Sequence, residues 1–174
     1  MDNQEIASRL RKLQDDREIR DLVARYALSV DDHDFDTLAS LWAPDARYQW
    51  KGASDWTVGA ENVAALLKSR IEPAGPSFHV NHDHIIEFGE DPDRATGILS
   101  SSAETSNATT HSIGAIRYND IYIRHDGSWK FQERVIGFLY MVPVSDYPGI
   151  LCARDRIRLT NGTRLAAHWP EFGR

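Results

Sequence analysis

The spacing of apolar residues changes near residue 77, and this change restricts the possible folds more than any other feature of the sequence. Before it, apolar residues recur at helical intervals, whereas the part that follows consists of long segments of alternating or β-branched residues. Turn residues separate these segments, and Asp126-Gly127 is typical of a β-hairpin. Helices followed by long antiparallel strands predict an α+β fold, in which N-terminal helices pack on one curved sheet. The predicted strands cover residues 78–88, 94–105, 111–126 and 128–142.

An apolar stripe from Ile19 to Val30 predicts the main helix of the N-terminal third. We expect Asp15 or Asp16 to cap this helix, and a separate amphipathic segment to precede it over residues 4–13. A second helix is expected over residues 35–42, because Pro44 disfavours helical backbone in the residue before it. The sequence also predicts a short strand over residues 46–50 and a third helix over residues 59–71.

Length and composition indicate one globular domain. A chain of 174 residues with 41% hydrophobic residues can form one well-buried core and is short for two. No repeat or linker divides it, so residues 1–174 are predicted to form a single domain. The last part, about residues 145–174, shows little periodicity, and we expect it to pack on a neighbouring subunit.

Charge and cysteine content limit the possible partners and compartment. The formal net charge is −6 and no cluster of Lys and Arg is present, which argues against binding to nucleic acid. No apolar run approaches the roughly 18 residues that a membrane span requires. A single cysteine, Cys152, excludes an internal disulfide and suits a reducing compartment. We therefore expect a cytoplasmic protein that binds neither nucleic acid nor membrane.

Three histidines, His79, His82 and His84, lie close together in the first long predicted strand. Their spacing resembles that of zinc ligands, but side chains of a strand alternate between its two faces. Alternation places His79 on one face with Asn81 and Asp83, and places His82 and His84 on the opposite face, unless a bulge intervenes. The sequence therefore predicts no metal site here. His79 is then either a hydrogen-bonded structural histidine or a base that needs an acidic partner.

The end of the first main helix offers that partner. Of the acids Asp31, Asp32 and Asp34, Asp31 lies about 110° from the centre of the apolar stripe and Asp32 about 150° on the other side. Asp31 is thus at the edge of the buried face, whereas Asp32 and Asp34 are expected to be in water. Tyr26 lies on the stripe itself, so its hydroxyl is expected to be buried and either to form one structural hydrogen bond or to bind a substrate oxygen.

Three segments together resemble the SnoaL-like branch of the nuclear transport factor 2-like superfamily: "IRDLVARYALSVDDHDFDTLASLWAPDARY", "SFHVNHDHIIEF" and "RHDGSWKFQERVI". The resemblance spans about residues 10–140. It implies a cone-shaped α+β barrel, a fold that carries dehydratases, isomerases, epoxide hydrolases, dioxygenase small subunits and non-enzymes. Within this group the chain is most similar to scytalone dehydratase, bile-acid 7α-dehydratase and hexachlorocyclohexane dehydrochlorinase.

The resemblance also implies roles for particular residues. Asp31 and His79 match the Asp-His dyad of these enzymes, and their separation of 48 residues fits two of them. Tyr26 matches a tyrosine of the bile-acid dehydratase, and Arg134 matches an arginine of the dehydrochlorinase, although an exposed strand arginine is an equal interpretation. The dehydratases carry a second His or Asp on the next strand, where this chain offers Ser100, Ser102 or Glu104 instead. Further expected substrate contacts are Tyr48, Trp50 and Asn81.

The expected function is that of a cofactor-independent lyase, a dehydratase or a related elimination enzyme, acting on a small hydrophobic cyclic or aromatic substrate. In this hypothesis Asp31, His79 and Tyr26 are catalytic, and Tyr48, Trp50, Asn81, Arg134, Ser102 and Glu104 bind substrate. The alternatives are an isomerase or epoxide hydrolase in the same cone, or the non-catalytic small subunit of a ring-hydroxylating dioxygenase. The resemblance also implies a homo-oligomer, with a trimer preferred over a dimer.

Overall fold

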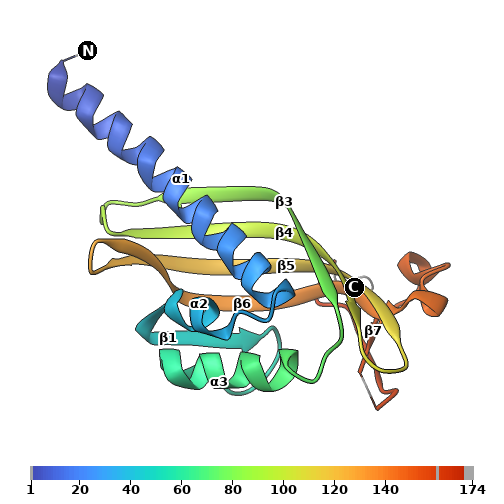
Figure 1. Cartoon of the computed structure of the whole chain (residues 1–174). Helices are drawn as coiled ribbons and strands as arrows, with labels where there is room; N and C mark the ends of the chain where they lie inside the picture. The colour runs from blue at the N-terminus through green and yellow to red at the C-terminus, as the bar shows by residue number, and fades with distance from the viewer. Residues whose placement is uncertain (1, 160, 171–174) are drawn as a thin grey trace.

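A computed structural model describes residues 2–159 and 161–170 of the chain. Within these residues, two helices, a first pair of strands and a third helix precede the four long strands in sequence, and the curved sheet lies behind a long helix (Figure 1). The helices are α1 (Asn3–Asp31), α2 (Phe35–Ser40) and α3 (Ala60–Ile71). The strands of the sheet are β1 (Trp42–Trp50), β2 (Thr57–Val58), β3 (Ser77–Phe88), β4 (Arg94–Ser106), β5 (His111–His125), β6 (Ser128–Pro143), β7 (Ile157–Arg158) and β8 (Arg164–Leu165).

The sheet confirms the predicted fold class. The strand order is β2-β1-β6-β5-β4-β3, with β1 parallel to β6 and the other neighbours on this path antiparallel. The four long strands begin and end within a residue or so of their predicted limits, because turn residues and Asp126-Gly127 interrupt a continuous alternation. Register shifts in β1, β3 and β6 bend the strands, so that the sheet curves around α1.

Helix α1 is continuous from Asn3 to Asp31, so the prediction of two separate helical segments was wrong. No Gly or Pro interrupts this stretch, and the first turn is capped by Asp2, whose side chain accepts a hydrogen bond from the Glu5 backbone N–H. The expected cap, Asp15, is instead a buried side chain in the middle of the helix. The N-terminal half of α1 therefore extends beyond the edge of the sheet (Figure 1).

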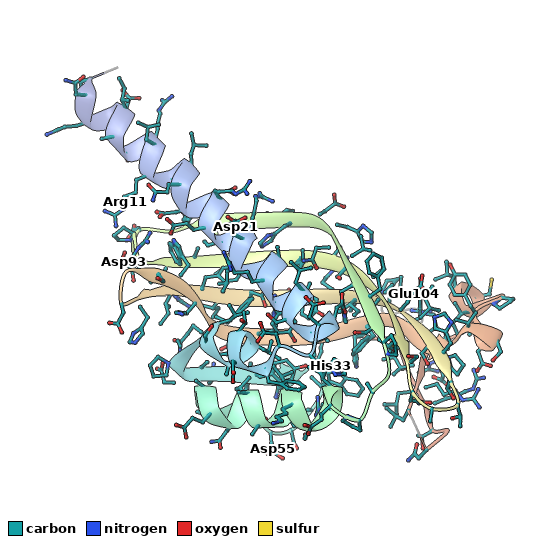
Figure 2. All side chains as sticks on the ribbon, in the orientation of Figure 1. Arg11, Asp21, His33, Asp55, Asp93 and Glu104 are labelled. Atoms are coloured by element: carbon teal, nitrogen blue, oxygen red, sulfur yellow. The ribbon has the colours of Figure 1, made fainter. Side chains whose placement is uncertain are left out.

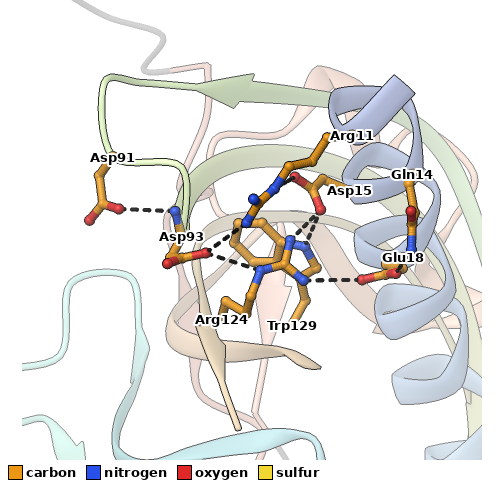
Figure 3. Close-up of polar contacts among 8 residues, drawn as sticks. All are labelled: Arg11, Gln14, Asp15, Glu18, Asp91, Asp93, Arg124 and Trp129. Atoms are coloured by element: carbon orange, nitrogen blue, oxygen red, sulfur yellow. Dashed lines mark hydrogen bonds and ion pairs between the residues drawn. The ribbon is translucent and has the colours of Figure 1, made fainter. Parts of the chain in front are cut away.

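Asp15 anchors α1 to the strands (Figure 3). Its carboxylate accepts hydrogen bonds from the Arg124 guanidinium and, at 3.3 Å, from the Trp129 indole N–H. Arg124 also donates to Asp93, which follows β3, and thereby joins the turn between β3 and β4 to the same cluster. A carboxylate with these partners is stable when buried, which explains why a charged residue lies inside the helix and not at its start.

Helix α2 ends at Ser40, two residues earlier than expected, and β1 begins at Trp42 and runs through Pro44. Proline has no backbone N–H for a strand ladder and is tolerated at irregular positions. Pro44 lies within the register shift between Trp42 and Arg47, where β1 does not pair regularly with β6. The proline therefore marks an irregular stretch of strand and not the end of a helix.

Most of the core lies between α1 and the concave face of the sheet. Ring contacts join Tyr26 of α1 to Trp42, Tyr118 and Phe131 of three different strands, with centroid separations of 5.7 to 6.2 Å. Such edge-to-face contacts favour one arrangement of the helix over the sheet. The core is therefore mainly aromatic at the level of Tyr26, five residues before the end of α1.

The described part of the C-terminal segment packs on its own sheet. The β7 strand pairs with β6 at Met141, and the His168 ring accepts a hydrogen bond from the Phe138 backbone N–H. Gly137 allows this packing, because a Cβ there would lie 2.9 Å from the Trp169 ring. The expectation that this segment packs on a neighbouring subunit concerns an assembly and stays a prediction. No helix in the described ranges is long and apolar enough to cross a membrane.

Candidate active site

A bulge in β3 changes the expected distribution of the three histidines. The register shifts between Asn81 and His84, so His84 lies on the inner face with His79 and Asn81, while His82 and Asp83 are exposed. The prediction that His84 shares the outer face with His82 was therefore wrong, because strict alternation fails across a bulge. His84 hydrogen-bonds to the Tyr122 hydroxyl at 3.1 Å, and burial lowers its pKa to about 4. It is a neutral histidine of the core.

Asp31 and His79 lie in contact. The distance from His79 Nδ1 to Asp31 Oδ1 is 2.6 Å, and both side chains are nearly buried, with 11% and 13% of their surface exposed. The His79 backbone N–H donates to Asp31 Oδ2 at 2.8 Å, and the Ser77 hydroxyl donates to Asp31 Oδ1 at 2.8 Å. The end of α1 and the start of β3 are thus joined through one carboxylate.

The hydrogen bonds keep Asp31 ionised. Burial by itself raises the pKa of this carboxyl, but the bonds from the His79 ring, the His79 backbone and Ser77 outweigh it and hold the pKa below its ordinary value. An ionised carboxylate accepts and cannot donate, so Nδ1 of His79 must carry the proton in the shared bond. In the neutral form of the ring, the other nitrogen, Nε2, is then an unprotonated acceptor.

His79 lines a cavity of about 410 Å³ between the helices and the concave side of the sheet. This volume lies in the usual range for small-molecule sites. Apolar and aromatic side chains form most of the lining, among them Val30, Leu67, Ile116, Ile136 and Phe138. A water-poor cavity of this kind strengthens electrostatic interactions with a bound molecule.

Three tyrosines, Tyr26, Tyr48 and Tyr118, also line the cavity. All three are at most 6% exposed, and burial raises the pKa of each phenol, with that of Tyr118 well above its ordinary value. Each phenol therefore keeps its proton at neutral pH and can donate a hydrogen bond. Tyr48 and Trp50 of β1 both line the cavity, and their contact with substrate stays a prediction.

Arg134 lies behind this phenol cluster and does not line the cavity. Its side chain is fully buried, donates to both carboxylate oxygens of Asp120 at 2.8 and 2.7 Å, and stacks 4.1 to 4.3 Å from the rings of Tyr26, Tyr118 and Phe131. Burial by itself lowers the pKa of the guanidinium, but the attraction and hydrogen bonds of Asp120 outweigh the effect of burial, so the pKa lies above its ordinary value. Arg134 is therefore a fixed cation beside the tyrosines, and its predicted direct contact with substrate is not what the structure shows.

Three further predicted contacts also lie outside the cavity lining. Ser102 and Glu104 lie on the outer face of β4. Ser102 bonds to His82 at 3.0 Å, and Glu104, which is labelled in Figure 2, pairs with His111 at 3.4 Å. The inward residues of β4 have odd numbers, and Ala103 occupies the cavity wall between them. Asn81 faces inward but approaches the Val23 carbonyl of α1. Glu104 therefore lies away from the cavity wall, where β4 places Ala103.

The structure adds residues that the sequence did not identify, namely Ser77, Arg70 and Tyr118. Ser77 directly precedes the predicted strand, so its contact with Asp31 required the fold. Tyr118 and Asp120 alternate with Tyr122 along β5, and an acid among inward aromatic residues is a signal for a buried charge that needs a partner.

The three histidines of β3 have separate partners, Asp31, Ser102 and Tyr122. Among residues 2–159 and 161–170, no three His, Cys, Asp or Glu side chains are grouped as metal ligands. The chemistry that the described side chains can provide is proton transfer, with one acceptor, His79 Nε2, and several phenol donors around a mainly apolar cavity.

Comparisons with solved structures agree with this fold. The structure of LinA matches with a TM-score of 0.73 and 26% identity over 80% of this chain and 95% of that chain. A type 2 hexachlorocyclohexane dehydrochlorinase (LinA) gives a TM-score of 0.72 and 25% identity over 79% and 93% of the two chains. A putative scytalone dehydratase from Novosphingobium aromaticivorans shares the fold, with a TM-score of 0.70 and 19% identity over 76% and 89%.

A search of curated protein sequences gives no significant match. The family model of the SnoaL-like domain, by contrast, matches residues 11–135, which include α1 with Asp31, the β3 strand with His79, and most of the long strands. This match covers more than half of the chain and coincides with the fold of the solved relatives. The chain therefore belongs to the SnoaL-like domain family, within the nuclear transport factor 2-like superfamily.

Proposed function

We propose that this protein is a cofactor-independent lyase that eliminates water, or a comparable leaving group, from a small hydrophobic cyclic or aromatic substrate. The contact between Asp31 and His79 at the wall of a 410 Å³ cavity carries this proposal. The solved relatives include a dehydrochlorinase and a putative dehydratase, and both names describe eliminations. Fold similarity alone gives no activity, so the proposal depends on the chemistry of the site.

In the proposed mechanism His79 Nε2 removes a proton from a carbon beside an electron-withdrawing group. The electrons of the broken C–H bond form the C=C bond, and the bond to the leaving oxygen breaks. A phenol of the Tyr26, Tyr48 and Tyr118 cluster donates a proton to that oxygen, which departs as water and leaves a phenolate. The proton on His79 then passes through solvent to this phenolate, so that both groups regain their starting states. Asp31 stabilises the imidazolium in the meantime.

The phenols and Arg134 have distinct parts in this mechanism. A correctly placed donor to a developing negative charge contributes about 3 kcal/mol of barrier lowering. Arg134 does not reach the cavity, but its cation lies beside Tyr26 and partly offsets the effect of burial on the pKa of that phenol. It therefore favours proton donation by the cluster without touching the substrate.

The test measures the dehydration of a panel of cyclic β-hydroxyketones, which is monitored through the ultraviolet absorbance of the conjugated product. His79→Ala is expected to reduce turnover by several orders of magnitude, with an unchanged circular dichroism spectrum. The matched control is His82→Ala, because His82 lies on the same strand but on its outer face. Full activity of the folded His79→Ala variant contradicts the proposed role of the base.

Labelled water separates elimination from the alternatives. An isomerase returns the proton at another carbon and introduces deuterium from D₂O without loss of oxygen, whereas an epoxide hydrolase introduces oxygen-18. Elimination gives a product without new solvent oxygen. Incorporation of oxygen-18 into the product excludes the lyase proposal.

We also propose that the chain forms a homo-oligomer, with a trimer as the first choice and a dimer as the second. The outer face of β3 and β4 exposes the apolar side chains of Phe78, Ile85 and Ile98, which are 62%, 60% and 48% exposed. Such a group on one sheet face favours an interface over free solvent exposure. Sedimentation equilibrium of the wild type, compared with Ile85→Lys, tests this: a monomeric wild type contradicts it.

A further inference from the structure

Arg70 is the cavity-lining residue that carries a permanent positive charge. It lies in the last turn of α3, and although the residue as a whole is exposed, its side chain forms part of the cavity wall. Its guanidinium is close enough to the buried Tyr48 hydroxyl to lower the pKa of that phenol against the larger effect of burial. The charge therefore lies where the cavity opens to solvent.

Within the described ranges, Arg70 forms no ion pair with an acidic side chain. The nearest acid along the helix, Glu72, forms an ion pair with Lys68 at 3.8 Å, and these two residues are one helical turn apart. Two other arginines of the sheet pair with acids, Arg134 with Asp120 and Arg124 with Asp15. Arg70 thus contacts the Tyr48 hydroxyl and still has guanidinium N–H donors that no carboxylate of the described residues occupies.

Among the residues that the structure describes, no carboxylate lines the cavity to neutralise or compete with this charge. Asp31, the nearest acid of the site, lies behind His79, and its oxygens accept three hydrogen bonds from His79 and Ser77. The other polar lining residues near the opening, Thr105 and Ser106, are neutral. The cavity therefore combines an apolar interior with one unpaired cation at its edge.

From this arrangement we infer that the substrate is a hydrophobic carboxylic acid, whose ring system fills the cavity and whose carboxylate binds Arg70 at the opening. The inference rests on the proposed function only in assuming that the substrate occupies this cavity. A guanidinium matches the two oxygens of a carboxylate, and the Tyr48 hydroxyl provides a further donor beside it. Placing the charge at the opening leaves it partly hydrated and avoids the large cost of burying an anion.

The experiment compares naphthalene-2-carboxylate with naphthalene-2-carboxamide, two probes of the same shape and different charge. Binding to the full chain is measured by isothermal titration calorimetry at pH 7.5, where the acid is ionised. The wild type is expected to bind the carboxylate about tenfold more tightly than the carboxamide. This preference should fall at high salt, because exposed charges are screened.

The substitution Arg70→Gln should abolish the preference by weakening carboxylate binding about tenfold, while carboxamide binding changes by less than about twofold. Lys68→Gln is the matched control on the same helix and should leave both affinities unchanged, since Lys68 does not line the cavity. The inference is overturned if the wild type shows no preference for the carboxylate, which includes the absence of binding by both probes. It is equally overturned if Arg70→Gln keeps the preference.

His79→Ala separates this inference from the proposed function. That variant should lose turnover but keep the carboxylate preference, because Arg70 acts on binding and not on proton transfer. If no elimination is ever observed but the preference depends on Arg70, the lyase proposal fails and the ligand class stands. If elimination is observed but the carboxylate preference is absent, the lyase proposal stands and the inferred ligand class is wrong.

Discussion

Replacement of Asp31 by Asn is the most informative perturbation of this site, because it keeps the shape of the side chain and removes its charge. The carboxylate accepts from the His79 ring, the His79 backbone N–H and the Ser77 hydroxyl at 2.6, 2.8 and 2.8 Å. An amide has one oxygen and one NH₂ group, so it cannot accept at both positions. Its orientation then decides the tautomer of His79.

The backbone N–H of His79 can only donate, so the amide oxygen must face it. The NH₂ group then faces His79 Nδ1 and the Ser77 hydroxyl, and the hydroxyl can turn to accept. Nδ1 must also accept, which moves the ring proton to Nε2. The nitrogen that faces the cavity is then protonated and cannot remove a proton from the substrate.

We expect Asp31→Asn to reduce kcat by about 10³ to 10⁴, as for tautomer reversal in a Ser-His-Asp triad, which corresponds to about 4 to 5.5 kcal/mol of transition-state stabilisation. The matched control is Asp32→Asn, since Asp32 is exposed at the adjacent position and should leave kcat within about twofold. Nitrogen-15 NMR of the His79 ring reads the tautomer directly, without any substrate. Wild-type turnover in folded Asp31→Asn, or a His79 ring that still carries its proton on Nδ1 in this variant, refutes the reasoning.

Two further predictions concern the buried charges. Asp120→Asn leaves the fully buried Arg134 cation without its counter-ion and should lower the free energy of unfolding by about 3 to 5 kcal/mol, measured by urea denaturation. Arg47→Gln, which removes the exposed partner of Glu133, is its control and should cost less than about 1 kcal/mol; equal losses contradict the role assigned to burial. The second prediction concerns His84, whose folded-state pKa of about 4 lies below the ordinary value of about 6.5. Between these values the unfolded chain binds the extra proton, so stability should decrease as the pH falls from about 6.5 to about 4 and show no further loss from this group below that. Unfolding midpoints measured across this range should depend less on pH in His84→Gln, and an identical pH dependence in both proteins counts against a neutral buried His84.

The sequence predicted the order of elements and the limits of the long strands, because both depend on local periodicity and turn residues. It also predicted that Asp31 lies at the edge of the buried face of α1, which follows from helical geometry alone. The sequence-based prediction failed where tertiary contacts override a local preference. Asp15 is a residue type that often caps a helix, but Arg124 and Trp129 from distant strands stabilise it inside a continuous helix.

The same limit applies to the predictions of which face of the sheet each strand residue occupies. Alternation placed His79 inward correctly, but a bulge after Asn81 reversed the faces, and His84 joined the core. In β4 the inward parity could not be fixed from the sequence, so Ser102 and Glu104 were expected where Ala103 is found. A shift of one residue exchanges the two faces of a strand, and pairing with its neighbours sets that shift.

For the site, the sequence alone determined which residue types were available: an acid at the end of a helix, a histidine at the start of a strand, and aromatic residues along the strands between. Tertiary structure decided which of them meet. The fold places Asp31 in contact with His79, although 48 positions separate them in the sequence. It also places Arg134 behind the tyrosines and Arg70 at the cavity opening. The physical reason is that periodicity is a property of neighbouring residues, whereas the partner of a buried charge is chosen by the packing of the whole sheet against α1 and by the cost of leaving that charge unpaired.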